Sequence, residues 1–185
     1  NFKLRHICVF SIKKLMKSKK NLVLLGMMGS GKSTIGSLLS KKLNIHFFDI
    51  DNIIEEKMDM AIIEIFEKMG ENFFRNLEEK ITIKFLNSTN SIISLGGGAF
   101  INEKIRTEVI THNLSFWLNC NNSTLINRIK KNKRRPLVNK LSKLELEELI
   151  AERAKIYSKA QFKINCHKLS KKEISSKIIE YYENN

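Results

Sequence analysis

The chain has 185 residues, a length that fits a single domain with a sizeable hydrophobic core. Hydrophobic residues make up 42% and charged residues 28% of it, which excludes a disordered protein, and no apolar run approaches the ~18 residues of a membrane span. Cys8, Cys120 and Cys166 are far apart in the sequence and lack metal-ligand spacing, so we expect reduced thiols in a cytoplasmic protein.

A net charge of +14 would suit a nucleic-acid-binding protein, but the basic residues are unevenly placed. Residues 1–20 hold seven of them and no acidic residue, whereas residues 21–185 hold the other 26 against 19 acidic residues. Lysines outnumber arginines by 26 to 7, which favours a solvated lysine surface that reflects an AT-rich genome. We therefore predict a monomer with no nucleic-acid partner and no membrane partner.

Residues 1–20 are predicted to be a basic N-terminal extension, either a targeting segment, a mis-assigned start or a disordered arm. From residue 21 to residue 185, short apolar segments alternate with segments of helical periodicity. Strands are predicted at 22–25, 46–49, 91–95, 114–118 and 162–165, and helical segments at 32–43, 52–69, 71–87, 102–113, 122–131, 144–159 and 171–182. This alternation predicts an α/β domain with a parallel sheet covered by helices on both faces.

The segment between the first predicted strand and helix is a glycine-rich loop. Gly26, Gly31, Lys32 and Ser33 match the phosphate-loop pattern G-x-x-x-x-G-K-[ST], in the strand–loop–helix context that the pattern requires. Glycines let backbone N–H groups approach phosphate oxygens, and the positive end of the helix points to the same place. We expect Lys32 to reach the β- and γ-phosphates of ATP and the Ser33 hydroxyl to ligate Mg²⁺. The predicted ATP contacts are Gly29, Ser30, Gly31, Lys32, Ser33 and Thr34.

The loop by itself does not separate kinases from GTPases and mechanical ATPases. The chain is small, and it lacks the N-K-x-D motif with which GTPases recognise guanine. Both features favour a kinase that acts on small molecules or nucleotides.

Asp49 and Asp51 stand at the end of the second predicted strand. Ligands of open α/β sheets bind outside the carboxyl ends of the strands, which places both acids near the phosphates. We expect Asp49 to hold Mg²⁺ through water, and Asp51 to accept a hydrogen bond from the acceptor hydroxyl and orient it for attack. The alternative for Asp51 is a structural role as the N-cap of the following helix.

Arg75 and Glu78 lie three residues apart, on one face of a predicted helix. Because the chain has only seven arginines, each is a candidate for the bidentate anion binding that lysine cannot provide. We expect Arg75 to bind an anionic substrate, Glu78 to orient it and Phe74 to supply an apolar wall. The alternative is a surface ion pair that contributes little to stability.

Gly96, Gly97 and Gly98 end the third predicted strand, where a ligand can approach a backbone that carries no side chains. We expect substrate contact there rather than a plain tight turn.

The polar segment 132–143 contains Arg134 and Arg135 before the single proline of the chain, Pro136.

That segment favours a lid, at about residues 130–143, which closes over ATP and brings an arginine to the transferring phosphate. An ordinary surface loop is the alternative. Arg153 on the next predicted helix is a second candidate for anion binding, or an exposed helix residue.

In this order, the segments resemble those of shikimate kinases. The resemblance runs from about residue 21 to residue 168 and rests on six motifs: Gly26–Thr34, Asp49–Asp51, Phe74–Glu78, Gly96–Gly98, Arg135–Leu137 and Arg153–Tyr157. It implies a P-loop NTPase fold of the nucleoside-monophosphate-kinase type, with three layers, a central five-stranded parallel sheet and a mobile lid. It also implies transfer of a phosphoryl group from ATP to the 3-hydroxyl of shikimate, in the route to chorismate and the aromatic amino acids.

The resemblance also implies roles for individual residues. The positions that look like shikimate contacts are Asp51, Arg75, Gly97, Gly98 and Arg153, with both arginines on the carboxylate. Glu78 resembles a supporting acid, and Phe66 and Phe74 look like ring-packing side chains. The nucleotide contacts are Arg135 on the phosphates, Arg128 on the adenine and, by a loose alignment, Lys168 near the adenine. The implied catalytic residues are Lys32, Asp51 and Arg135.

Two other functions stay open on the sequence. One is another small kinase of the same fold, acting on gluconate or a nucleotide, although a gluconate kinase would not be expected to carry Phe74, Arg75 and Glu78 together with Gly96–Gly98. The other is a non-catalytic binding protein built on this fold, for which the net charge of +14 is the one supporting feature.

Overall fold

The computed structural model describes residues 20–131 and 141–184. The predicted extension up to residue 19, and with it Cys8, lies outside the described residues. So does most of the predicted lid, including Arg134, Arg135 and Pro136.

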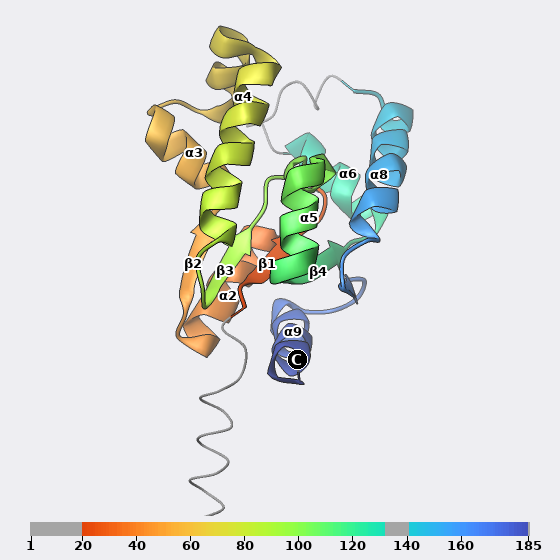
Figure 1. Cartoon of the computed structure of the whole chain (residues 1–185). Coiled ribbons are helices and arrows are strands. Elements are labelled where there is room, and N and C mark those ends of the chain that lie inside the picture. Colours follow the sequence, from red (N-terminus) through yellow and green to blue (C-terminus); the bar gives the residue numbers. More distant parts are fainter. Residues whose placement is uncertain (1–19, 132–140, 185) are drawn as a thin grey trace, which may run out of the picture.

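The described residues form a five-stranded parallel sheet with the strand order β2-β3-β1-β4-β5. The strands are β1 Leu22–Leu25, β2 His46–Asp49, β3 Ser91–Ser94, β4 Leu114–Asn119 and β5 Phe162–Asn165. All five predicted strands are confirmed, and so is the parallel α/β architecture. Because β1 is central, the loop that follows it opens at the middle of the carboxyl edge of the sheet (Figure 1).

The helices are α2 Lys32–Leu43, α3 Ile50–Met58, α4 Ile62–Leu86, α5 Glu103–His112, α6 Asn122–Lys131, α8 Lys143–Tyr157 and α9 Lys171–Asn184, with a short 3₁₀ turn η1 at Ala99–Ile101. The sequence predicts a helical stretch at 52–69 and a second helix at 71–87. In the structure α4 covers both segments, but Gly70 divides it into two helices, since its φ of 83° and ψ of 167° are not helical. The boundary that the sequence predicts at residue 70 is therefore confirmed. A residue with a side chain would adopt that φ only with strain, so this glycine sets the bend.

Helix α3 begins two residues earlier than predicted, directly after β2. Asp49 therefore occupies the N-cap position and Asp51 lies in the first turn of the helix. The alternative in which Asp51 caps the helix is wrong, because the chain turns into the helix without a connecting loop.

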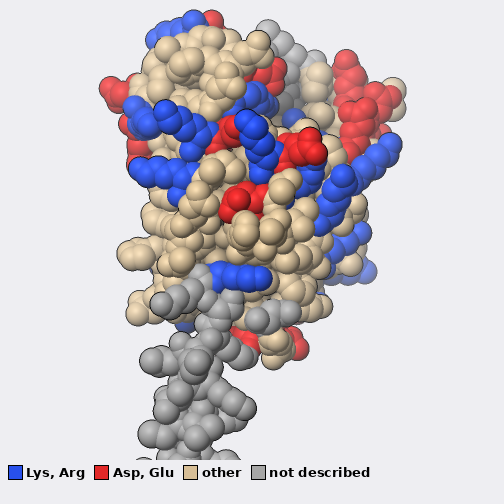
Figure 2. Space-filling model, in the orientation of Figure 1, with Lys and Arg blue, Asp and Glu red and all other residues tan. Residues whose placement is uncertain are grey.

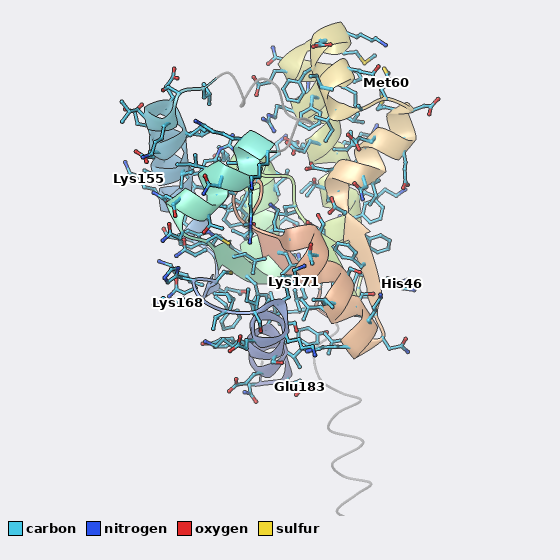
Figure 3. All side chains as sticks on the ribbon, turned by 180° about the vertical axis from the view of Figure 1, so that it is seen from behind. His46, Met60, Lys155, Lys168, Lys171 and Glu183 are labelled. Atoms are coloured by element: carbon cyan, nitrogen blue, oxygen red, sulfur yellow. The ribbon has the colours of Figure 1, made fainter. Side chains whose placement is uncertain are left out.

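Two hydrophobic cores lie on opposite faces of the sheet. Alternate residues of β1 point to opposite faces, so Val23 and Leu25 pack under α3, α4, α5, α6 and α8, whereas Leu22 and Leu24 pack under α2 and α9. Figure 1 shows α4, α5 and α8 on the near face, and Figure 3 shows α2 and α9 on the other. The three layers hold the carboxyl edge of the sheet rigid, and every predicted site residue that is described lies near that edge or on a helix beside it. Within the described residues, no helix is long and apolar enough to cross a bilayer.

Candidate functional site

The loop after β1 wraps tightly because three of its glycines have positive φ. The φ values are 139° at Gly26, 78° at Gly29 and 94° at Gly31. A Cβ atom on Gly26 would lie 2.9 Å from the backbone oxygen of Leu118, so the loop approaches β4 more closely than any other residue would allow. Gly31 occupies the N-cap position of α2, and Lys32 is the first residue of that helix. The first N–H groups of α2 therefore face the space that the loop encloses.

Two cationic side chains brace this loop. The ammonium of Lys32, which is only 8% exposed, donates to the backbone oxygens of Gly26 at 2.9 Å and Met27 at 3.1 Å. The guanidinium of Arg128 on α6 donates to the backbone oxygen of Gly29 at 2.9 Å. The buried hydroxyl oxygen of Ser30 has no hydrogen-bond partner among the described residues. The loop thus concentrates positive charge and donors around a cradle that suits a phosphate chain.

Ser33 and Asp49 meet at the start of α2 and the end of β2. The Ser33 hydroxyl is close enough to the Asp49 carboxylate to lower the pKa of that group. Burial raises the pKa of Asp49, the Ser33 hydrogen bond opposes the rise and the neighbouring Asp51 charge adds to it. Within the described residues no three His, Cys, Asp or Glu side chains cluster as a metal site. A hydroxyl and a carboxylate are nevertheless the oxygen donors with which proteins hold Mg²⁺ beside substrate phosphates.

A cavity of about 720 Å³ connects the loop to Asp51. Residues 28–35 form one wall, and Asp49, Asp51 and Asn52 close it on the β2 side. At the other end lie Thr124 and Arg128 of α6 and the loop between β5 and α9. This cavity is large enough for a nucleotide, since small-molecule sites measure roughly 300–1,000 Å³. Asp51, which the sequence predicts to contact the acceptor, therefore lines the same cavity as the phosphate loop.

The far end of the cavity is lined by His167, Lys168 and Lys171. Lys168 has a φ of 59°, a left-handed conformation in the turn between β5 and α9. Figure 3 labels Lys168 in this turn and Lys171 at the start of α9. The structure therefore brings Lys168 into the same cavity as Arg128, as the predicted adenine contacts require.

Arg75 is held in a fixed orientation on α4. Its guanidinium donates to Glu78 at 2.7 Å and to Glu71 at 3.2 Å. It also lies over the rings of Phe66 at 5.8 Å and Phe74 at 5.2 Å, distances suited to cation–π contact. Burial by itself would lower the pKa of Arg75, but the two carboxylates outweigh it and raise the pKa, so the charge is permanent.

The surroundings of this arginine do not fit the alternative of a solvated surface ion pair. The side chain of Glu78 is only 4% exposed and that of Arg75 is 36% exposed. Phe74 is buried at 3% exposure and supports the guanidinium from beneath, while its ring lies 4.6 Å from that of Phe66. Arg75 therefore presents a pre-oriented cationic fork, which lowers the entropic cost of binding a carboxylate.

Each of the three glycines after β3 meets a different functional group. A Cβ atom on Gly96 would lie 2.5 Å from a Glu78 carboxylate oxygen and 2.8 Å from one of Asp51. A Cβ atom on Gly98 would lie 2.7 Å from the Arg75 guanidinium. Side chains at these positions would displace the groups that converge there. A plain tight turn does not require such contacts, so close approach explains the triplet better than turn geometry does.

Arg153 reaches the glycine triplet from α8. Its guanidinium donates to the backbone oxygen of Gly97 at 3.4 Å and contacts the Met27 sulfur at 3.7 Å. It therefore lies between the glycine turn and the phosphate loop, and the alternative of an exposed helix residue is wrong. None of Arg75, Glu78, Gly97, Gly98 and Arg153 lines the 720 Å³ cavity. They adjoin it through Asp51 and Met28, whose backbone nitrogen lies 3.3 Å from a Cβ position on Gly97.

Tyr157 is a residue whose role the sequence did not reveal. It ends α8 one turn after Arg153, it is 2% exposed, and its hydroxyl donates to the backbone oxygen of Gly97. Its ring packs at 6.0 Å from that of Trp117. The four-residue spacing from Arg153 was a signal that both side chains share one face of the helix.

The thiols of Cys120 and Cys166, which are far apart in the sequence, also line the 720 Å³ cavity.

The comparisons with known proteins agree with this geometry. A family model described as shikimate kinase matches residues 28–183. The shikimate kinase of Bartonella quintana is 35% identical over 184 residues, covering 97% of this chain and 88% of its own length. The shikimate kinase of Sulfurihydrogenibium is 38% identical over 160 residues, covering 86% of this chain and 96% of its own length.

Solved structures give the same result. A shikimate kinase from Acinetobacter baumannii in complex with shikimate aligns with a TM-score of 0.86 at 27% identity, covering 93% of this chain and 97% of the other. The shikimate kinase of Aquifex aeolicus aligns with a TM-score of 0.80 at 36% identity, covering 89% and 97%. A deoxyadenosine kinase from M. mycoides, at a TM-score of 0.62 and 17% identity, shares the fold alone. The chain has the P-loop fold of small-molecule kinases, and it belongs to the shikimate kinase family.

Proposed function

We propose that this protein transfers the γ-phosphoryl group of ATP to the 3-hydroxyl of shikimate, with its residues in the roles described below. We assign the roles mainly from the side chains that converge on the turn Gly96–Gly98. There Asp51, Arg75 and Arg153 come from three helices to one turn, beside the phosphate loop. A hydroxylated ring with one carboxylate is the kind of acceptor that such a set would bind.

On the donor side, backbone N–H groups of the loop and of the start of α2 bind the phosphates. These N–H groups belong to Gly29, Ser30, Gly31 and Thr34, among others. Lys32 exchanges its bonds to Gly26 and Met27 for bonds to the β- and γ-phosphates. Ser33, and Asp49 through water, would hold Mg²⁺, and the bound ion would supply positive charge that neutralises the charge on the phosphates. Arg128 and Lys168 flank the adenine.

On the acceptor side, Arg75 and Arg153 bind the carboxylate, and Gly97 and Gly98 give it access to backbone N–H groups. Phe66 packs on the ring edge, while Phe74 and Glu78 keep Arg75 in place. Asp51 accepts a hydrogen bond from the 3-hydroxyl and aims its oxygen at the γ-phosphorus. A loose transition state develops little charge on the attacking oxygen, so orientation by Asp51 contributes more than proton removal. Arg135, outside the described residues, stays a sequence-based proposal for the transferring phosphate.

We also propose that the protein is monomeric and cytoplasmic and has no nucleic-acid or membrane partner. Residues 1–20 would lie outside the catalytic domain. On the face in Figure 2, Lys and Arg side chains are interspersed with Asp and Glu rather than joined into one basic surface. This mixture supports a solvated charged face. Light scattering checks the oligomeric state, and salt-dependent DNA binding at sub-micromolar affinity would contradict the proposal.

The deciding experiment is a coupled assay of ADP release with Mg²⁺ and ATP, run separately with shikimate, gluconate and nucleoside monophosphates. We expect release with shikimate only, and none from the Lys32→Met variant. Phosphorylation of another acceptor at a higher kcat/KM would overturn the assignment. Omission of Mg²⁺, with chelator present, should abolish turnover, and unchanged turnover would remove the metal from the proposal.

A further inference from the structure

Cys120 and Cys166 stand side by side at the carboxyl ends of neighbouring strands. Strands β4 and β5 are parallel with Asn119 opposite Asn165, and the Cys166 N–H donates to the Asn119 backbone oxygen at 2.9 Å. Cys120 and Cys166 are the next residues along the chain, immediately after the ends of the two strands. Neighbouring strands lie about 4.8 Å apart, a spacing within the roughly 4.4–6.8 Å that a disulfide bridges between Cα atoms. The two thiols are close enough for each to shift the pKa of the other, while the Cys166 thiol donates to the Ile164 backbone oxygen at 3.4 Å.

The pair borders the nucleotide half of the site. Both cysteines are free thiols, and both line the 720 Å³ cavity, through which a small oxidant can reach them. The Cys120 thiol donates to the backbone oxygen of Ser30 at 3.4 Å. Cys120 is 8% exposed, so this bond forms where water does not compete for the carbonyl. The thiol therefore helps to hold a central residue of the phosphate loop.

The surroundings make one of the two thiols a nucleophile. The hydrogen bond from Cys166, with the positive charges of Arg128 and Lys32, lowers the pKa of Cys120 to about 7 against the opposing effect of burial. The hydrogen bond to Cys120 and burial raise the pKa of Cys166. A thiolate beside a neutral thiol is the arrangement in which oxidation of the first is resolved by the second.

We propose that Cys120 and Cys166 are an oxidation site for hydrogen peroxide, at which a disulfide forms and weakens ATP binding. The Cys120 thiolate attacks the peroxide oxygen, the O–O bond breaks, and hydroxide leaves to become water. Cys166 then attacks the resulting sulfenic acid, giving the disulfide and a second water. Two thiols lose two electrons and two protons, and one peroxide accepts them. The ATP half of this inference rests on the proposed function.

The coupling to ATP follows from the contact with Ser30. The disulfide permanently removes the S–H that protonated Cys120 donates, so the Ser30 carbonyl loses this donor and the loop must rearrange around a buried oxygen. The crosslink also fixes Cys166, whose neighbours His167 and Lys168 line the adenine end of the cavity. By linkage, bound ATP must oppose oxidation as strongly as oxidation opposes ATP. ATP in the cavity would in addition cover both thiols.

The test treats the purified full chain with hydrogen peroxide and maps disulfides in an alkylated, non-reduced digest by mass spectrometry. Cys8→Ser serves as the matched control, because Cys8 is the third cysteine of the chain. Cys120→Ser and Cys166→Ser each remove one partner, and each protein is compared with its own reduced form. We expect a Cys120–Cys166 crosslink in the parent and in Cys8→Ser. The KM for ATP should rise about tenfold, within the range usual for coupled sites, and return after reduction.

Four outcomes would overturn the inference. They are no crosslink, a crosslink with unchanged KM for ATP, reversible inactivation of Cys166→Ser equal to that of the parent, and crosslinking that ATP does not slow. Binding of a fluorescent ATP analogue to the oxidised and reduced chains gives a readout that does not need shikimate. A reduced chain that binds ATP but does not phosphorylate shikimate would contradict the proposed function alone.

Discussion

The donor half and the acceptor half of the site are built in different ways. In the donor half, the phosphate loop, α2 and the bonds of Lys32 to Gly26 and Met27 all lie within one short stretch of chain. In the acceptor half, the Arg153 guanidinium and the Tyr157 hydroxyl reach Gly97 across 56 and 60 residues. Figure 3 labels Lys168 in the turn before α9, at the nucleotide end of the site.

This difference has a consequence for substitutions. The donor half depends first on local backbone geometry, which the glycines and the start of α2 set, and it adds Arg128 of α6 and Asp49 of β2 from outside the loop. The acceptor half depends on three helices, α3, α4 and α8, meeting at one turn. We therefore expect donor substitutions to affect turnover with little change in shikimate affinity, and most acceptor substitutions to affect that affinity first.

The largest effect is expected for Lys32→Met. Removing the one ammonium that the loop carries should lower kcat by about 10³-fold, the upper range for loss of one preorganised electrostatic contact. Steady-state kinetics with both substrates checks this. Lys41→Met, an exposed position in the last turn of the same helix, is the control and should keep parental kcat. A fall of less than tenfold would mean that the N–H groups of the loop suffice.

The next effect is expected for Asp51→Asn, which keeps the shape and removes the charge. It should lower kcat by about 10²-fold, the lower range for general-base contributions, and leave the KM for shikimate within a few-fold. Asp59→Asn, at the left-handed C-cap of the same helix, is the matched control, since asparagine tolerates that conformation. A rise in KM with unchanged kcat would assign Asp51 to binding instead of orientation.

Arg75→Lys and Arg153→Lys test the shared carboxylate site. Each keeps the charge and loses the planar fork, so the KM for shikimate should rise about 10- to 100-fold, as for a charged hydrogen bond. The KM for ATP should stay close to that of the parent. Arg106→Lys on α5, where the guanidinium donates to backbone oxygens of Phe100 and Ile101, is the control. Arg153 also contacts Met27 of the phosphate loop. If Arg153→Lys instead raised the KM for ATP, Arg153 would belong to the donor half as well, and the division into two halves would be wrong there.

The smallest effect is expected for Tyr157→Phe. Losing the hydroxyl removes the buried donor of the Gly97 carbonyl and leaves it the Arg153 guanidinium at 3.4 Å, which should lower the free energy of unfolding by about 1 kcal/mol. The KM for shikimate should rise about fivefold, a size typical of one neutral hydrogen bond. Denaturant unfolding and steady-state kinetics measure the two, with the exposed Tyr181→Phe as control. Lower stability with unchanged KM would limit Tyr157 to a structural role.

The sequence by itself determined the phosphate loop, the five strands and most helix limits. These depend on local spacing: Gly26, Gly31 and Lys32 lie within one turn of chain, and each strand is a short apolar run. The sequence did place a helix boundary at Gly70, but it could not show that α3 starts directly at Ile50. Helix ends depend on packing that local propensity does not record.

Only the tertiary structure decided which distant residues meet. It gave Tyr157 a partner at Gly97, it surrounded Arg75 with two aromatic rings, and it set Cys120 against Cys166. From the sequence we predicted two unrelated thiols, because the separation of two residues along the chain does not reveal which strands are neighbours in the sheet. The order β2-β3-β1-β4-β5 makes β4 and β5 neighbours. In β5, Phe162 and Ile164 face the core beneath α2 and α9 while Lys163 and Asn165 are exposed, and this alternation fixes the register that brings the two thiols together.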